Sequence, residues 1–132
     1  MLRLIPLAAL LALAGCDAFS SDTRGVDLNV RDAQVAPGDE VLAVLDNDSG
    51  RAVTYSPCPQ LGRLGADGFV PVSPNAICQS ILVGVEAGGT IAFRIPVPAD
   101  APEGEYAVRI EVGREQPDQA VTSAAFRVVR AQ

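Results

Sequence analysis

The residue types that most often carry catalysis are scarce in this chain. It contains no His, and all ten basic residues are Arg. Imidazole base chemistry near neutral pH and lysine-based Schiff-base or Ser–Lys chemistry therefore have no residue to perform them. The glutamates at 103, 105, 111 and 115 fall mostly at alternating positions that should face solvent, and nothing places two of them in one pocket. We expect a protein that is not an enzyme and that uses no cofactor and no metal ion.

The three cysteines are the most reactive side chains that remain. Cys16 ends an apolar N-terminal segment, whereas Cys58 and Cys78 form an even pair further along. In an exported protein such a pair predicts a Cys58–Cys78 disulfide, which would stabilise the fold by about 3 kcal/mol. A metal site would lack His partners and a second Cys pair, and a redox-active pair would more typically have C-x-x-C spacing. Two free thiols are the main alternative.

Residues 46–50 (DNDSG) look briefly like the start of a calcium loop. The match fails at the sixth and twelfth positions, where Arg51 and Pro57 replace the expected Gly and Glu. A turn with Asx hydrogen bonding at the end of a strand explains the segment better.

The N-terminus has the three-part layout of a secretory signal peptide: Arg3, an apolar run over residues 4–14, and then Leu-Ala-Gly-Cys. An apolar run of about 11 residues is too short to span a bilayer as a helix, which takes about 20. Residues 13–16 resemble the lipobox of bacterial lipoproteins. The resemblance implies removal of residues 1–15 and a lipidated Cys16 as the mature N-terminus. An ordinary signal peptide with a chance Cys is the alternative.

This leader predicts a lipoprotein of the bacterial cell envelope, held at a membrane by lipid on Cys16 and facing the periplasm or the exterior. An Asp directly after the lipidated Cys retains lipoproteins in the inner membrane of some enteric bacteria, but other lineages do not follow this rule. Asp17 therefore leaves the choice between inner and outer membrane open. Residues 16–25 are polar and Ser-rich and predict a lipidated, flexible tether. The formal net charge of -6 argues against a nucleic-acid partner, because phosphate binding needs clustered basic residues.

Residues 26–132 alternate between apolar and polar with a period of two, which predicts β-strands. The clearest examples are residues 26–30, 91–95 and 105–112, and turn signals such as APGD at 36–39 and AGG at 87–89 separate the strands. About seven to eight short strands with this spacing favour an antiparallel β-sandwich. The long connection from Cys58 to Gln79 favours a sandwich over a barrel.

Several of these segments resemble bacterial immunoglobulin-like domains: residues 36–47, the EAGGT turn at 86–90 and PEGEYAVR at 102–109. The resemblance covers roughly residues 26–129 and implies an immunoglobulin-like sandwich. It also implies a tyrosine corner at Tyr106, a motif in which the hydroxyl bonds to backbone a few residues upstream. Antibody domains also have a core Trp, and a Cys two residues after this Tyr. This chain contains no Trp, and Val108 stands at the position of the Cys.

Three functions follow as hypotheses. The first is a non-enzymatic, lipid-anchored module that binds a protein or glycan or supports an envelope assembly. The second is a proteinase inhibitor that uses the loop at 56–79, which contains four prolines. The third, an enzyme, is poorly supported by the residue types.

Overall fold

The computed structural model describes residues 23–72, 81 and 83–130, and within them the chain is all-β with no helix. No helix long and apolar enough to cross a membrane occurs among those residues. The strands are β1 (Val26–Val30), β2 (Gln34–Val35), β3 (Glu40–Asn47), β4 (Val53–Tyr55), β5 (Gln60–Gly65), β6 (Gly68–Pro71), β7 (Val83–Val85), β8 (Thr90–Pro96), β9 (Gly104–Gly113), β10 (Gln119–Thr122) and β11 (Phe126–Val128).

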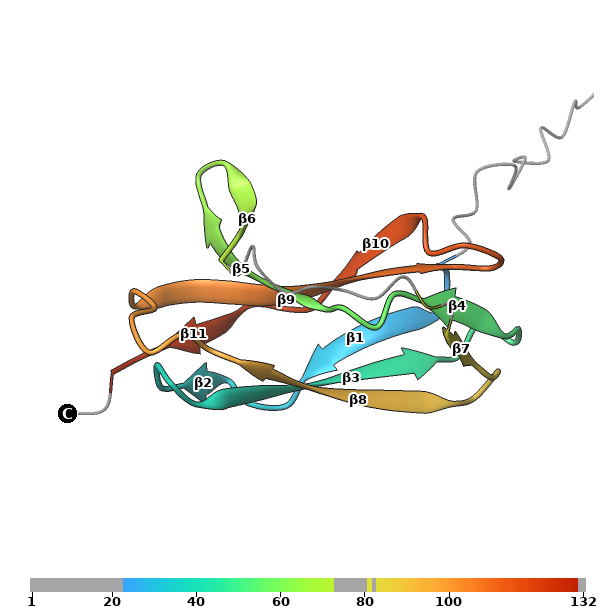
Figure 1. The fold of residues 1–132 in the computed structure, drawn as a ribbon, viewed down its shortest axis with the longest axis horizontal. Helices are drawn as coiled ribbons and strands as arrows, with labels where there is room; N and C mark the ends of the chain where they lie inside the picture. The colour runs from blue at the N-terminus through green and yellow to red at the C-terminus, as the bar shows by residue number, and fades with distance from the viewer. Residues whose placement is uncertain (1–22, 73–80, 82, 131–132) are drawn as a thin grey trace, which may run out of the picture.

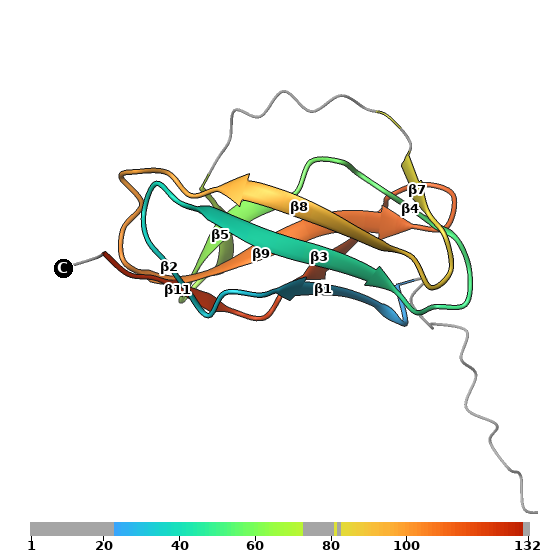
Figure 2. The ribbon, with the colours of Figure 1, turned by 90° about the horizontal axis from the view of Figure 1, so that it is seen from below.

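These strands form two packed sheets, so the predicted β-sandwich is confirmed (Figure 1, Figure 2). The first sheet is antiparallel, in the order β1-β3-β8. The second sheet is built around β9, which pairs with β10 and β11 along one edge and with β4 and β5 along the other. Beyond these, β7 joins β4, β6 joins β5 and β2 joins β11.

The core lies between the sheets and follows the alternation of the sequence. Along β3, the side chains of Val41, Ala43 and Leu45 are fully buried. They face a buried row on β9 that contains Tyr106 and Val108. Burying such apolar surface contributes roughly 25 cal/mol per Å², so the residues that β3 and β9 place between the sheets stabilise the sandwich.

The number and direction of strands differ from the expectation. The described residues form eleven strands, more than the seven or eight predicted, because β2, β5 and β10 were missed. Strand β5 has the sequence QLGRLG, in which two glycines interrupt the apolar period, and β2 has only two residues. The β2–β11 pair is parallel, so the sandwich is not purely antiparallel.

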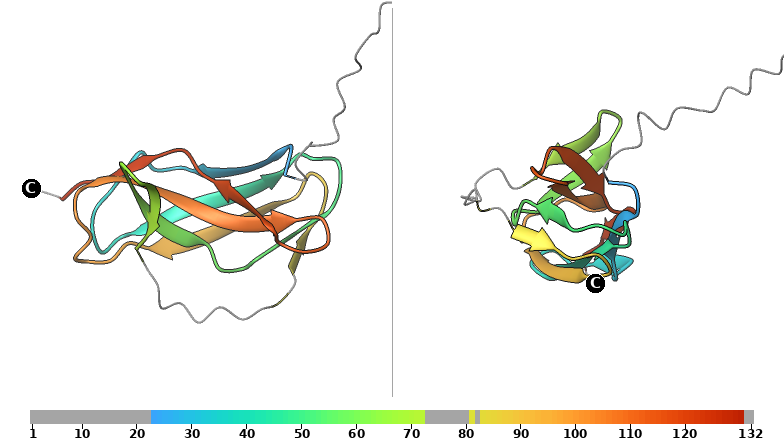
Figure 3. Two further views of the ribbon diagram at one scale, coloured as in Figure 1. Left: turned by 90° about the horizontal axis from the view of Figure 1, so that it is seen from above. Right: turned by 90° about the vertical axis from the view of Figure 1, so that its right-hand side faces the viewer.

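The long connection after Cys58 contains more regular structure than the sequence predicted. Its described part folds into β5 and β6, which pair from Gly62 with Pro71 to Gly65 with Gly68. Gly68 has a φ of 83°, a conformation that glycine adopts at little cost. Figure 3 shows this hairpin, hereafter the β5–β6 hairpin, standing out from the second sheet. Ile81 lies before β7 and is 55% exposed.

Candidate functional site

Of the cysteines assigned a role from sequence, the structure describes Cys58 alone. Cys58 is half-buried between β4 and β5 and has a bonding partner. Cys16 and Cys78 lie outside the described residues. The lipidation of Cys16 and the pairing of Cys58 with Cys78 therefore stay predictions.

Tyr106 lies on β9 at the position expected for a tyrosine corner. Its side chain is fully buried, and its hydroxyl donates a 2.6 Å hydrogen bond to the carbonyl oxygen of Pro102. Its ring lies 6.3 Å from that of Phe126 on β11. The bond ties the start of β9 to the loop before it, and its role is structural rather than chemical.

Residues 46–50 also have a structural role. Asn47 is fully buried, and its amide nitrogen donates to the carbonyl oxygens of Arg51, Val85 and Glu86 at 2.7, 3.2 and 3.1 Å. Its side-chain oxygen accepts from the backbone N–H and the hydroxyl of Ser49. No group of three or more potential metal ligands occurs in the described part of the chain.

The glutamates at positions 103, 105, 111 and 115 are all exposed, as expected from the alternation of the sequence. Arg94 makes a 3.9 Å ion pair with Glu40 on the outer face of the first sheet. Both side chains are more than half exposed, so this pair adds little to stability.

The β5–β6 hairpin is the first surface feature with a shape suited to recognition. The ring of Phe69 on β6 packs over Gly62 on β5, where any added Cβ would overlap the ring. The guanidinium carbon of Arg109 lies 4.0 Å from the centre of the same ring, a cation–π contact. Arg109 also donates to the hydroxyl of Thr122 on β10 at 3.3 Å. These contacts fix the hairpin to β9, while Val70 remains 52% exposed.

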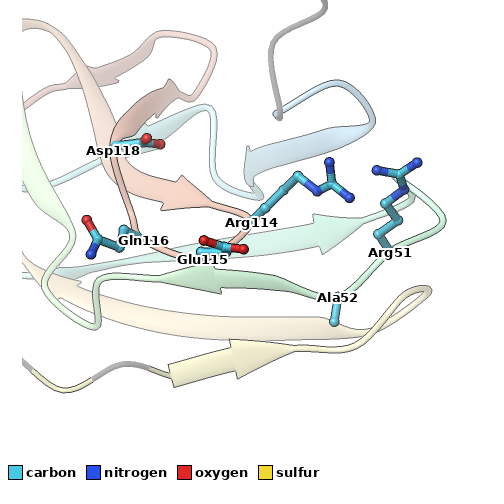
Figure 4. A pocket seen from close by; sticks show the side chains of 6 residues that line it. All are labelled: Arg51, Ala52, Arg114, Glu115, Gln116 and Asp118. Carbon is cyan, nitrogen blue, oxygen red and sulfur yellow. The ribbon is translucent and has the colours of Figure 1, made fainter.

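A pocket of about 630 Å³ is the second feature (Figure 4). It lies between the β3–β4 turn and the β9–β10 loop. It is lined by Arg51, Ala52, Arg114, Glu115, Gln116 and Asp118. Its lining therefore includes two guanidinium groups and two carboxylates, all on exposed residues.

From the sequence, Arg51 was considered only as a mismatch to a calcium loop, and Arg114 was given no role. The two residues are 63 positions apart, and neither belongs to a motif. They meet because β4 pairs with the end of β9, with Thr54 opposite Gly113. Only the register of that long-range pair, which the sequence does not reveal, could have brought them together.

Comparisons with known proteins give no family. No family model matches the chain, and no curated protein matches it. One solved structure with some likeness is an alkylpurine DNA glycosylase, AlkC, from Pseudomonas fluorescens, bound to DNA containing an abasic site analog, at 10% identity and TM-score 0.44. Another is a family 123 glycoside hydrolase from Clostridium perfringens, at 14% identity and TM-score 0.35.

Each likeness covers 80% of this chain but only 30% and 28% of those two proteins. At these scores and identities neither carries an argument about this chain, and the activities of those enzymes are not transferred to it.

Proposed function

We propose that this chain is a lipid-anchored protein of the bacterial cell envelope whose β-sandwich is a non-enzymatic module that binds another protein. The observation that carries the binding role is the β5–β6 hairpin, which stands out from the second sheet and is held in place before any partner arrives (Figure 1). A surface that is already ordered loses little conformational freedom on binding, so more of its contact energy appears as affinity.

The expected location rests on the leader. The Leu-Ala-Gly-Cys segment at residues 13–16 supports lipidation of Cys16, and the polar tether after it would leave the sandwich free beside the membrane.

A protein is a better match for the hairpin than a glycan. The exposed apolar side chain on β6 is Val70, which suits an apolar contact. The one ring on the described hairpin, that of Phe69, is already occupied by Arg109 on one face. Among the described strands β6 pairs only with β5, so its other backbone edge could additionally pair with an extended segment of the partner.

A photo-crosslinking amino acid at position 70 tests this proposal in the bacterium that makes the protein. We expect one discrete protein adduct from position 70 and none from Asp27, an exposed site on the opposite sheet. The Gly62→Ala variant should weaken the adduct, because it displaces Phe69. Adducts no stronger at position 70 than at position 27 would refute binding through the hairpin.

The proteinase-inhibitor hypothesis has one observation in its favour, since the projecting hairpin lies inside residues 56–79. A reactive loop must be rigid and exposed, and the tip of the hairpin at residues 65–68 is both held and accessible. Incubation of the mature protein at micromolar concentration with a panel of proteases tests it. Full protease activity throughout the panel would exclude this role.

A further inference from the structure

The pocket between the β3–β4 turn and the β9–β10 loop has a lining of both charges. Figure 4 shows the guanidinium groups of Arg51 and Arg114 on one side and the carboxylates of Glu115 and Asp118 on the other. Within the described residues neither arginine takes part in an ion pair, although carboxylates lie in the same pocket. Two guanidinium groups without such partners retain their capacity to bind an anion.

The arginine side of the pocket is built on fixed backbone. The carbonyl oxygen of Arg51 accepts hydrogen bonds from Asn47 at 2.7 Å and from the Ser49 hydroxyl at 3.1 Å. Because the main chain is held while the guanidinium group stays exposed, Arg51 presents its charge from a defined position.

The opposite wall is a tight loop that depends on Gly113. A Cβ at Gly113 would overlap the carbonyl oxygen of Gln116, and the Asp118 N–H donates to that same oxygen at 2.9 Å. The loop therefore folds back closely onto the end of β9, which fixes the backbone that carries Arg114, Glu115 and Asp118.

The pocket lies at the end of the sandwich where the chain enters. The carbonyl oxygen of Gly25 accepts a 2.8 Å hydrogen bond from the N–H of Asp48, in the same turn that carries Arg51. Seven residue steps separate Cys16 from Thr23. Even fully extended, they span no more than about 25 Å, so a lipid on Cys16 would keep this end close to the membrane surface.

We propose that this pocket binds the zwitterionic headgroup of phosphatidylethanolamine and so orients the domain on its membrane. The phosphate lies between Arg51 and Arg114, and the ammonium group lies against Glu115 and Asp118. A purely anionic headgroup would leave those two carboxylates facing no cation, so the mixed lining favours a headgroup with both charges. The primary ammonium of phosphatidylethanolamine can donate hydrogen bonds to the carboxylates, whereas the quaternary ammonium of phosphatidylcholine has no N–H to donate. This inference rests on the lipid anchor of the proposed function and adds a second, specific contact with the same membrane.

Hydrogen–deuterium exchange of the mature, membrane-purified protein in lipid nanodiscs tests the inference. The discs contain phosphatidylcholine alone, or equal parts of phosphatidylcholine with phosphatidylethanolamine or with phosphatidylglycerol. We expect slower exchange at residues 51–52 and 113–118 only with phosphatidylethanolamine. If the headgroup occupies the pocket three-quarters of the time, exchange that requires an empty pocket slows about fourfold.

The matched variants change the same number of charges at opposite ends of the molecule. Arg51→Gln/Arg114→Gln should abolish the protection. Arg31→Gln/Arg130→Gln should keep it, because Arg31 follows the far end of β1 and Arg130 follows β11, both away from the pocket (Figure 1).

Three outcomes would overturn the inference. Equal exchange in all discs removes the pocket contact, and protection by phosphatidylglycerol alone indicates an anion site. In a further sample, free phosphoethanolamine is added to discs of phosphatidylcholine alone, and equal protection there indicates a soluble zwitterion as the ligand. The intact mass of the same samples separates the two proposals: a lipidated protein without protection refutes only the headgroup contact, whereas an unlipidated protein refutes the anchor on which it rests.

Discussion

At the scale of single residues, Asn47 shows both what the sequence could predict and what it could not. The DNDSG segment predicts an Asx-type turn, and the Ser49 N–H indeed donates to the side-chain oxygen of Asn47 at 3.2 Å. The sequence did not predict that Asn47 is buried and bonds to Val85 and Glu86, because these partners are 38 and 39 residues away. Local patterns report local hydrogen bonds, whereas a cross-loop bond depends on the assembled fold.

Replacing Asn47 with Ala should destabilise the protein strongly. The change leaves the carbonyl oxygens of Val85 and Glu86 without their side-chain donor and removes the acceptor for Ser49. We expect a loss of about 3 kcal/mol in the free energy of unfolding, since a fully buried side chain loses three donated hydrogen bonds and its role as acceptor for Ser49. Urea denaturation measures it, and a loss below about 0.5 kcal/mol, the low end for one hydrogen bond, would contradict this role for Asn47.

Tyr106→Phe isolates the hydrogen bond of the corner, because the ring and its packing against Phe126 are kept. The carbonyl oxygen of Pro102 belongs to an exposed residue, so water can replace the lost hydroxyl. We therefore expect a smaller cost, about 1 kcal/mol. It should appear as a lower urea midpoint with an unchanged slope. An unchanged midpoint would show that the 2.6 Å bond adds nothing.

At the scale of elements, strands with a clean period of two were predictable and strands without one were not. β8 alternates between exposed and more buried side chains, and β9 does so over residues 108–112, although Ala107 is also fully buried. Both strands were expected from sequence. β5 was missed because the glycine that interrupts its pattern, Gly62, is required by the Phe69 ring above it. A long-range packing requirement thus removed the local signal for the strand.

Gly62→Ala tests the attachment of the β5–β6 hairpin. The added methyl group overlaps the Phe69 ring and should displace it from Arg109. We expect a loss of about 1–2 kcal/mol in stability, typical of overpacking, and faster amide exchange across residues 60–71. Gly65→Ala is the matched control, because a Cβ there meets open space. Equal effects of the two substitutions would mean that Phe69 does not hold the hairpin.

At the scale of the whole molecule, the sequence predicted the sandwich but not its connectivity. Alternation identifies the strands that face a core, yet it does not say which strands are neighbours. The joining of β4 and β5 to one edge of β9 is one such pairing, and it produces both the projecting hairpin and the charged pocket. Neither the hairpin nor the pocket could therefore be predicted from the sequence.

The predicted Cys58–Cys78 disulfide would affect the stability of the whole domain, because it would link the two ends of the long connection that contains the hairpin. Cys58→Ser/Cys78→Ser should lower the free energy of unfolding by about 3 kcal/mol, chiefly by freeing the unfolded chain. Calorimetry of the variant beside the parent protein measures the change. If a reducing agent leaves the melting temperature of the parent protein unaltered, the two cysteines are not joined.

The anchor at Cys16 is the central claim, since both the location of the protein and the role of its entry end depend on it. The most direct measurement is the intact mass of the protein extracted from membranes of the bacterium that makes it. We predict the mass of residues 16–132 plus a diacylglycerol group, with a further acyl chain where the amine is acylated, less two hydrogens for the disulfide. A chain that still begins at Met1, or one that begins at an unmodified residue, would contradict the account.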